Sequence, residues 1–527
     1  MNQRQYAPWV FIFFLFNINM NFLQIIPPSL GYGTSRIPRA VGQLYGTNIH
    51  LPWDWGISDS QPLLEQANVT WIRSDFWWSM LEPTNDTWGM DISTREGTIN
   101  CLQFLDWFVA NTSASGMKVL ALLSYGTSWA CPPFVDERGM HYSTNPYNVA
   151  DFADYVSFVV RRWKGNSSMG YYEIYNEPNI NSYWRSNDTT VKEFANLTIA
   201  AAQAIKAEDP SAIVIGPGLS GIGLEIPGYE SSRNRYPNFL QAWYDAVQTY
   251  THGHFKDLFD GFACHPYGDI NHYYPYLLSL FNQWVNARSA ADGKQYLKFV
   301  TETGATTADL GIDYHIQGQI NAKMMIFSAT NDLDVHIQYE FFDTSTPTPP
   351  ELVYGKIGLD GENTFGLVES DFATRKPGYF AFKVITNLLT NGTFLPGWID
   401  LALDQKNNIQ AFAFCTRNNE IAIAYWSFTK MFDRLHLILD TAGKINDVRI
   451  YRPITNYTAE PFTPEGTSLN LPLSEDLHIV IIQNTTAVQG IYGSLAPFSY
   501  LIYIAPIGLI ALTFIVILGD QTKRIKH

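Results

Sequence analysis

The stretch from Tyr171 to Pro178 reads YYEIYNEP, a short apolar and aromatic run that ends in an Asn, a Glu and a strand-breaking Pro. A β-strand that stops in this way delivers a carboxylic acid to the rim of a sheet or barrel. A second strand-like run, at 298–301, ends the same way in Glu302. Glycosidase chemistry requires two such groups, because one protonates the leaving oxygen and the other attacks the sugar or activates water. We therefore expect Glu177 and Glu302 to be a catalytic pair.

Strand-like apolar runs alternate with amphipathic helical stretches through the first two thirds of the chain. The expected strands lie at 44–49, 69–75, 118–124, 171–176, 212–216, 261–265, 298–301 and 335–341, with helices at 99–113, 149–163, 191–208, 236–251, 276–291 and 317–330. This alternation over roughly 300 residues predicts a closed (β/α)8 barrel at 38–390. A doubly wound open sheet is the alternative. The barrel is favoured because polar strand ends occur on several strands, whereas an open sheet concentrates them at one crevice.

After the barrel, short alternating runs separated by turn residues predict a small antiparallel β-sandwich at 391–486. Residues 487–499 are rich in small side chains and are expected to form a stalk. The uncharged run at 500–518 is long enough to span a bilayer as a transmembrane helix. Basic residues follow it, which predicts a cytoplasmic tail at 519–527. A lipid-anchor signal is the alternative, although such signals usually end in the apolar run.

Residues 1–30 carry one basic residue, Arg4, followed by an apolar stretch, and are expected to be a signal peptide or an uncleaved anchor. We therefore expect the catalytic domain to lie outside the cell, or in the lumen of the secretory pathway. The N-x-Ser/Thr sequons predict a glycosylated exterior. They are Asn68, Asn85, Asn111, Asn166, Asn187, Asn196, Asn391, Asn456 and Asn484. Asn68 immediately precedes an expected buried strand, so we expect it to stay unmodified.

The net charge of −15 argues against nucleic acid as a partner, because a phosphate polymer would be repelled. No His/Cys spacing resembles a metal site, and no cofactor is expected. The four cysteines permit three full disulfide pairings, among which the sequence does not choose. Cys264 lies in an apolar run and is expected to be a buried thiol.

The proposed chemistry needs two carboxyl groups in different protonation states. Arg73 and the Tyr267 hydroxyl are expected to hold Glu302 ionised, and the charge of Glu302 then raises the pKa of Glu177. Asn176 is expected to donate its amide to the sugar 2-hydroxyl. A nucleophile close to an acid/base predicts a two-step retaining displacement, with the carboxyl groups ~5–5.5 Å apart.

Alternate side chains of a barrel strand point inward, so parity predicts which residues share the site. If Glu177 faces the axis, Tyr175 and Glu173 face it as well, and Val300 lies beneath the second carboxylate. Glu173 would then be a buried carboxylate that needs a partner. The arginine of the 69–75 strand is one candidate, and a salt bridge on the helix side is the alternative.

Further substrate-binding candidates follow the expected strands. His50 comes directly after the first strand, and His265 ends the sixth, where it either reaches the site or braces the rim. Trp78, Trp129 and Trp184 follow the second, third and fourth strands, where aromatic platforms for sugar rings would lie. Packing is the alternative for each of these three.

Several segments resemble the clan A retaining glycoside hydrolases, nearest to the branch that contains β-xylosidases, α-iduronidases and exopolysaccharide endoglycosidases, with cellulase-like relatives close. They are 69–83 (VTWIRSDFWWSMLEP), 118–129 (KVLALLSYGTSW), 172–184 (YEIYNEPNINSYW), 262–268 (FACHPYG) and 366–379 (GLVESDFATRKPGY). The resemblance implies that Glu177 is the acid/base, Glu302 the nucleophile, Asn176 the 2-hydroxyl ligand, and Arg73, His265 and Tyr267 further residues of the site.

One departure from these relatives concerns the eighth strand. Many of them end it with a Trp beneath the reacting sugar, whereas residues 340–343 here read EFFD. The long segment at 344–375 that follows is expected to form part of the substrate wall. Taken together, we expect an exported, membrane-anchored retaining glycosidase that acts on β-linked polysaccharide or glycan. A non-catalytic carbohydrate-binding surface glycoprotein on the same barrel is the alternative.

Overall fold

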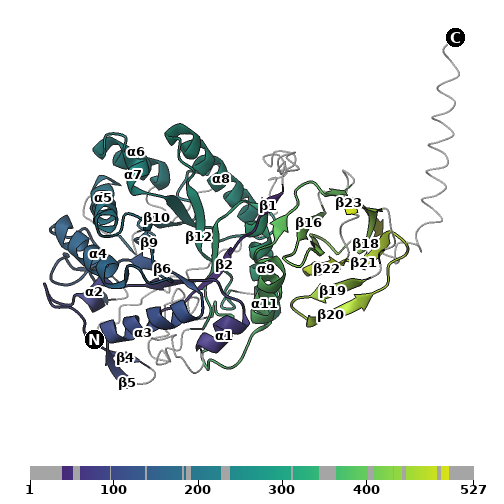
Figure 1. The fold of residues 1–527 in the computed structure, drawn as a ribbon, viewed down its shortest axis with the longest axis horizontal. Helices are drawn as coiled ribbons and strands as arrows, with labels where there is room; N and C mark the ends of the chain where they lie inside the picture. Colours follow the sequence, from purple (N-terminus) through teal and green to yellow (C-terminus); the bar gives the residue numbers. More distant parts are fainter. Residues whose placement is uncertain are drawn as a thin grey trace, which may run out of the picture. The chain divides into compact units, whose positions relative to one another are not determined.

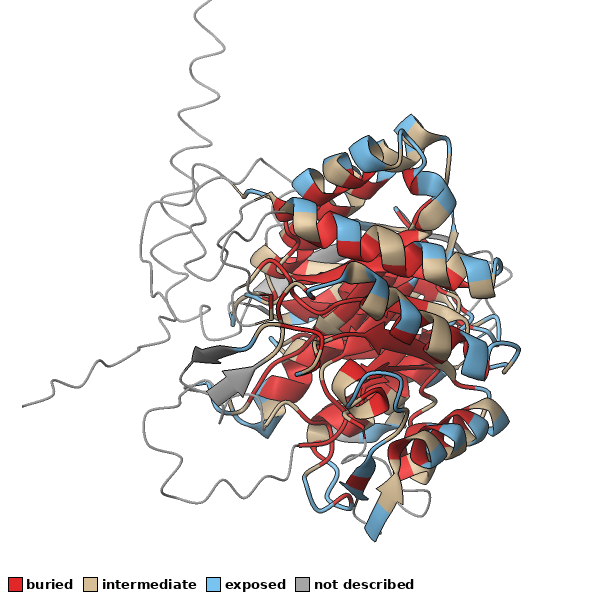
Figure 2. Ribbon diagram, turned by 90° about the vertical axis from the view of Figure 1, so that its left-hand side faces the viewer, coloured by how far each residue is buried: buried red, intermediate tan, exposed pale blue. Residues whose placement is uncertain are grey.

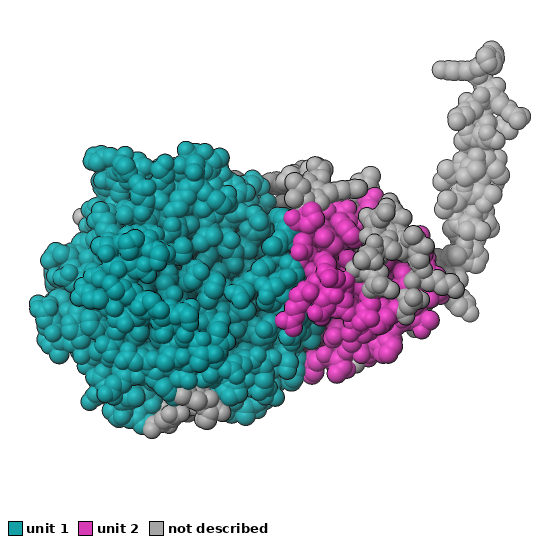
Figure 3. All heavy atoms as spheres, in the orientation of Figure 1, with its two compact units in different colours: residues 1–34, 39–392 teal, residues 35–38, 393–527 magenta. Residues whose placement is uncertain are grey.

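The computed structural model describes residues 38–51, 60–94, 97–136, 139–180, 183–184, 191–226, 238–309, 312–343, 364–401, 408–430, 432–441, 445, 447–483 and 488–497. The chain divides into two compact units, with the boundary between Gly392 and Thr393 (Figure 3). Within the described ranges no helix has the length and apolarity to cross a membrane. The expected signal at 1–30, transmembrane helix at 500–518 and tail at 519–527 lie outside the described residues.

The first unit is a closed barrel of parallel strands (Figure 1). Around the barrel the strands follow their order in the sequence: β2 (Tyr45–Asn48), β3 (Trp71–Asp75), β6 (Lys118–Leu123), β9 (Tyr171–Ile174), β10 (Ile213–Ser220), β11 (Gly261–His265), β12 (Leu297–Thr303) and β13 (Val335–Gln338). The barrel closes where β13 pairs in parallel with β2. The predicted (β/α)8 barrel is therefore confirmed, and the open sheet is excluded.

Helices surround the strands and mostly bury one face each, whereas α9 is buried on nearly all sides. They are α1 (Ser60–Gln66), α2 (Trp78–Leu81), α3 (Cys101–Ala114), α4 (Val149–Trp163), α5 (Val191–Glu208), α6 (Phe239–Tyr250), α7 (Phe255–Leu258), α8 (Tyr273–Asp292), α9 (Tyr314–Thr330) and α11 (Pro377–Leu389). Figure 2 shows buried residues gathered on the strands and inner helix faces, with exposed residues on the outer faces. Asn100 and Asn148 cap α3 and α4, because each side chain accepts a hydrogen bond from a backbone N–H of the first turn.

Three short pieces complete the unit. β1 (Arg39–Ala40) precedes the barrel, and two hairpins follow strands on the rim. β4 (Asp91–Thr94) pairs with β5 (Gly97–Asn100), and β7 (Phe134–Asp136) pairs with β8 (Gly139–His141).

The barrel interior is filled by an apolar layer. It consists of Trp71, Leu120, Ile215, Ala263, Phe299, Val335 and Ile337, which come from six of the strands. Two residues further along their strands, Arg73, Glu173, Thr301 and His265 also point inward, where they bond to one another. Polar side chains therefore replace the apolar layer toward the carboxyl ends of the strands, where active sites of such barrels lie.

The second unit contains two sheets that enclose an apolar core. Its strands are β14 (Thr393–Phe394), β15 (Ile399–Leu401), β16 (Ile409–Cys415), β17 (Ile421–Ser427), β18 (Phe432–Thr441), β19 (Val448–Arg452), β20 (Asn456–Phe462), β21 (Ser468–Pro472), β22 (His478–Ile482) and β23 (Val488–Pro497). One sheet runs β14-β16-β17-β22-β19-β20, and the other runs β15-β23-β18-β21. Ile423, Tyr425, Leu435, Leu437 and Val480 belong to the core cluster of this unit.

The expected stalk at 487–499 is instead largely a strand. β23 pairs antiparallel with β18 and in parallel with β15, so its backbone is bonded on both sides. Small side chains made this segment resemble a linker. The backbone groups of a segment can nevertheless pair whatever its side chains are, and here two neighbouring strands supply the partners.

The cysteines are unpaired. Cys101, Cys131 and Cys264 are buried, and Cys415 is half-buried. None of the three possible pairings is therefore present, and the prediction of a buried Cys264 thiol is confirmed.

Candidate active site

The end of β9 turns sharply to present Glu177. Tyr175 and Glu177 both have left-handed backbone conformations, with φ of 75° and 42°. The Glu177 N–H donates to the Gly218 carbonyl at 2.7 Å, which fixes the turn against β10. Because Tyr175 breaks the strand conformation, its ring packs outward against Trp184 and against Phe194 of α5. The expectation that Tyr175 faces the barrel axis is wrong for this reason.

Glu302 reaches the mouth through an irregularity in β12. Phe299 belongs to the interior layer, and Thr301 points inward above it. Regular alternation would turn Glu302 away, but the pairing of β12 with β13 shifts register between Val300 and Thr303. Such bulges re-aim side chains next to active sites. The interior layer beneath the carboxylate is thus Phe299, and the expected Val300 is wrong.

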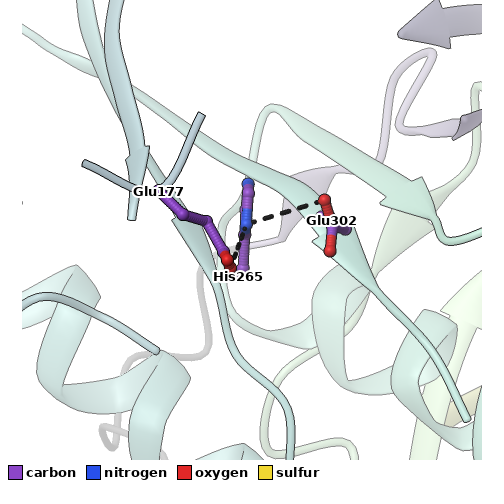
Figure 4. Close-up of side chains that lie close together, drawn as sticks. All are labelled: Glu177, His265 and Glu302. Carbon is purple, nitrogen blue, oxygen red and sulfur yellow. Dashed lines mark hydrogen bonds and ion pairs between the residues drawn. The ribbon is translucent and has the colours of Figure 1, made fainter. Parts of the chain in front are cut away.

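The two carboxylates converge on one histidine. Figure 4 shows His265 between Glu177 and Glu302, with a contact to each. His265 Nδ1 lies 2.9 Å from Glu177 Oε1 and 3.7 Å from Glu302 Oε2. A carboxylate oxygen of Glu177 and one of Glu302 lie within 4.8 Å of each other. The structure therefore brings the two carboxylates together as expected, and of the two alternatives for His265 it has the one that reaches the site.

Arg73 connects the site to the buried layer below it. Its Nε donates to Glu173 Oε2 at 2.5 Å, and its Nη2 donates to Asn176 Oδ1 at 2.8 Å. Its Nη1 lies 3.5 Å from Glu302 Oε2. The predicted partner of Glu173 is confirmed. With its oxygen held by Arg73, the Asn176 amide group keeps N–H donors that can serve a ligand.

The ionisation of Glu302 depends on opposing effects. Burial raises its pKa, and the charge of Glu177 acts in the same direction. The Arg73 charge and the Tyr267 hydroxyl, which donates to Glu302 Oε1 at 2.7 Å, lower it. The net direction is a pKa above the usual value. The expected contacts are present, but they do not outweigh burial.

His50 lies at the mouth between two carboxylates. Its Nδ1 is 3.2 Å from Asp75 Oδ2, and its Nε2 is 3.2 Å from Glu340 Oε2. Burial alone would lower the pKa of His50, but these two partners together raise it well above its ordinary value. The position of His50 agrees with the prediction. Its acidic partners were not anticipated.

The predicted tryptophan platforms are packed into the protein. Trp184 is fully buried against Tyr175 and Phe194, so it has no face to offer a sugar. Trp78 is also buried. Trp129 is half-buried, packs on Trp78, and its indole N–H donates to the Glu82 carbonyl. The platform prediction is wrong for Trp184 and Trp78, and the contacts of Trp129 are those of a packing residue.

Other aromatic residues line the mouth instead. Trp77, Tyr125 and Tyr183 are each only partly buried. The Trp77 and Tyr125 ring centroids lie 6.0 Å apart, and those of Tyr125 and Tyr183 lie 6.1 Å apart with nearly parallel planes. Burial raises the pKa of Tyr125, and the charges of Asp75, Arg73 and Glu302 act on it, which places its hydroxyl near the site. We call these three residues the aromatic trio.

Phe365 contributes to the opposite side of the mouth. It packs against Tyr267 and Tyr339, with ring centroids 6.1 Å and 5.3 Å away. Residues 344–363 of the expected substrate wall lie outside the described residues, and Phe365 belongs to the part that follows. Phe341 and Phe342, which follow β13, are fully buried.

Comparison with known proteins identifies the class. The family model of glycoside hydrolase family 44 matches residues 134–270, a segment that includes Asn176, Glu177 and His265. No sequence among the curated proteins matches the chain significantly. The barrel, the convergent carboxylates and the family match together define a glycosidase. Its clan and its family stay predictions.

Solved structures share the fold at low sequence identity. A family 39 glycoside hydrolase from Bacteroides cellulosilyticus WH2 superposes with a TM-score of 0.60 at 20% identity, covering 84% of this chain and 81% of that one. A monomeric β-xylosidase from Caulobacter crescentus CB15 gives 0.54 at 15% identity, covering 86% and 100%. A family 30 endoxylanase from Clostridium papyrosolvens C71 gives 0.54 at 12% identity, covering 85% and 98%.

Proposed function

We propose that the protein is a retaining glycoside hydrolase that cleaves β-glycosidic bonds of a polysaccharide or glycan. The observation that supports this is the separation of the carboxylates, whose oxygens lie within 4.8 Å. Retaining enzymes hold the two carboxyl groups roughly 5–5.5 Å apart, whereas inverting enzymes leave roughly 6.5–9.5 Å for a water molecule. The matched family and the named structural neighbours are also glycoside hydrolases or glycosidases.

Each carboxyl group has its own task. The Glu302 carboxylate attacks the anomeric carbon while Glu177 gives its proton to the leaving oxygen, so that a glycosyl-enzyme ester forms. The Glu177 carboxylate then takes a proton from water, whose oxygen displaces Glu302 from the sugar. Both groups return to their starting states. Arg73 and Tyr267 are positioned to stabilise Glu302 when it carries charge.

The assignment is tested by removing each carboxyl group in turn. We expect Glu302→Ala to abolish turnover, because it removes the carboxylate that attacks the anomeric carbon. We expect Glu177→Ala to retain activity only on aryl glycosides with good leaving groups, and azide to restore part of it as a replacement nucleophile. Rates on aryl β-glycosides with and without azide are the measurement.

A matched control is Glu82→Gln, since Glu82 is also a buried carboxyl group on the same rim but bonds to Trp78. It should keep turnover. Full activity in Glu302→Ala or in Glu177→Ala without azide would refute the assignment.

The protein acts outside the cytosol and is held at a membrane. This part of the proposal rests on the apolar runs near both ends of the chain and on the number of sequons. Asn85, Asn196 and Asn391 have exposed side chains, so a glycosylation enzyme could reach them.

A further inference from the structure

A chain of hydrogen bonds runs beneath the two carboxylates and ends on Glu177. Glu173 accepts from the Thr301 hydroxyl at 2.8 Å. Thr301 Oγ1 lies 3.1 Å from His265 Nε2, and His265 Nδ1 lies 2.9 Å from Glu177 Oε1. Glu173, Thr301 and His265 are fully buried. We call these three residues the relay.

The direction of each hydrogen bond in the relay follows from its first member. Glu173 is ion-paired with Arg73 and can only accept, so the single hydroxyl proton of Thr301 points toward it. The Thr301 oxygen must then accept from His265, which places the imidazole proton on Nε2. Nδ1 therefore faces Glu177 with a lone pair.

The contact between His265 and Glu177 consequently needs a proton from Glu177. At 2.9 Å, a lone pair on Nδ1 and a carboxylate oxygen without a proton would repel each other. The proton is therefore assigned to the Glu177 carboxyl group, which is the state that a general acid must have before reaction.

The opposite tautomer leaves a conflict elsewhere. With the proton on Nδ1, Thr301 would have to donate to Nε2. Its oxygen and Glu173 Oε1 would then meet at 2.8 Å with no proton between them. A doubly protonated ring would avoid the choice, but burial lowers the pKa of His265 to about 4, so the ring is neutral at neutral pH.

Gly218 of β10 gives independent support, because the backbone there makes room for the relay. A Cβ at this position would lie 2.3 Å from Glu173 Oε1, 2.4 Å from His265 Nε2 and 3.0 Å from Thr301 Oγ1. The Gly218 carbonyl also accepts the Glu177 N–H. Gly218 thus leaves space for all three residues of the relay, and its carbonyl fixes the backbone of Glu177.

We propose that Glu173 and Thr301 are positioning residues that fix the tautomer of His265 and thereby keep Glu177 protonated. This inference rests on the proposed function of Glu177. The charged and titratable groups that face His265 are Glu177 and Glu173 from β9 and its end, Glu302 from β12 and Arg73 from β3.

The first test compares Thr301→Val with Thr301→Ser. Valine keeps the shape but loses the hydroxyl, so the ring can move its proton to Nδ1 and donate to an ionised Glu177, which lowers the pKa of that acid. We expect the basic limb of the kcat/KM profile to move down by about 1 pH unit. Substrates with poor leaving groups should lose about 10- to 100-fold in rate, and activated aryl glycosides should lose little.

Two controls separate this role from a structural one. Thr301→Ser restores the hydroxyl and should restore the profile. Thr303→Val removes another fully buried hydroxyl of β12, which donates to the Pro266 carbonyl, and should leave the basic limb in place. An equal loss on both substrate types in Thr301→Val, with an unmoved basic limb, would overturn the proposal.

The second test does not need activity. Infrared difference spectra should show the C=O stretch of a protonated carboxyl group at neutral pH that is absent in Glu177→Gln. We expect this band to titrate at lower pH in Thr301→Val and to be unchanged in Thr301→Ser and Thr303→Val. If the band titrates at the same pH in Thr301→Val as in the wild type, Thr301→Ser and Thr303→Val, the relay does not keep Glu177 protonated. If the band responds as expected but the wild type hydrolyses no glycoside, the proposed function fails while the relay stands.

Discussion

A single buried contact removes Asn68 from the set of usable sequons. Its side-chain N–H donates to the Thr386 carbonyl at 3.2 Å, and the residue is only partly exposed. An oligosaccharide must be attached to this same nitrogen. When the chain is expressed in a glycosylating secretory host, we expect glycans at Asn85, Asn196 and Asn391 and none at Asn68. Glycopeptide mass spectrometry measures the occupancy of each site.

High occupancy at Asn68 would show that glycosylation precedes formation of the buried contact. Unmodified asparagines at all four positions would contradict the proposal that the chain is exported. Asn68→Gln is the matched control, because it removes the sequon while keeping an amide at this position.

Among single residues, the sequence predicts which residues belong to the site better than it predicts where their side chains point. Glu177 and Glu302 were found because each ends an apolar run, and Arg73 was proposed because a buried Glu173 would need a partner. The orientation of Tyr175 could not be found, since nothing in its residue type announces a left-handed backbone. The position of Val300 could not be predicted either. A register shift in β12 puts Phe299, and not Val300, in the interior layer beneath the carboxylate.

The loops after β3, β6 and β9 each contribute one member of the aromatic trio to the mouth. Aromatic faces bind sugar rings, and a contact of this kind contributes about 0.5–1.5 kcal/mol. We expect Trp77→Ala and Tyr183→Ala to lower kcat/KM on oligosaccharides by about 2- to 13-fold for each lost contact, with little change on aryl monoglycosides. Kinetics on a length series of oligosaccharides measures this.

Trp184→Phe is the matched control, because Trp184 is the fully buried neighbour of Tyr183. Any loss in this variant comes from packing and should be the same for short and long substrates. A Tyr183→Ala effect that does not depend on substrate length would contradict a role in sugar binding.

The rim loops also explain why the sugar platforms were predicted one residue away from the partly exposed rings of Trp77 and Tyr183. Trp77 and Trp78 are consecutive, and α2 begins at Trp78, which turns that ring into the protein. Tyr183 and Trp184 form a second such pair. The sequence shows that an aromatic residue follows each strand. Which of two neighbours faces the mouth depends on where a helix starts, and boundaries are the least certain part of a sequence-based assignment.

The barrel as a unit carries a buried histidine that makes its stability depend on pH. His336 of β13 is fully buried, with Nδ1 2.8 Å from Ser328 Oγ, and burial lowers its pKa to about 3. The unfolded chain takes up a proton below about pH 6.5 while the folded one does not, so stability present above that pH is lost as the pH falls. This residue alone should cost about 3 kcal/mol by pH 4.

Urea unfolding of the wild type and of His336→Gln, measured between pH 7 and pH 4, checks this expectation. Glutamine keeps a hydrogen-bonding group but does not titrate, so its free energy of unfolding should fall less steeply with decreasing pH. Parallel curves for the two proteins would show that another group dominates acid unfolding.

The architecture was largely predictable, because few arrangements of alternating strands and helices bury the apolar faces of both kinds of element. Each expected barrel strand overlaps an observed one, from β2 to β13. The stalk was the main error, because composition describes side chains and β23 is held by its backbone. The predictions for the two ends of the chain, which fall outside the described residues, stay predictions.

The left-handed conformation of Glu177 has a consequence for engineering. An L-residue in such a conformation carries a local penalty on the order of 1–3 kcal/mol, and glycine at the same position would largely escape it. A library selected for heat resistance alone would thus tend to replace the acid and enrich sturdier but inactive sequences. Selection on this scaffold should couple thermotolerance to turnover, so that position 177 is kept for its chemistry.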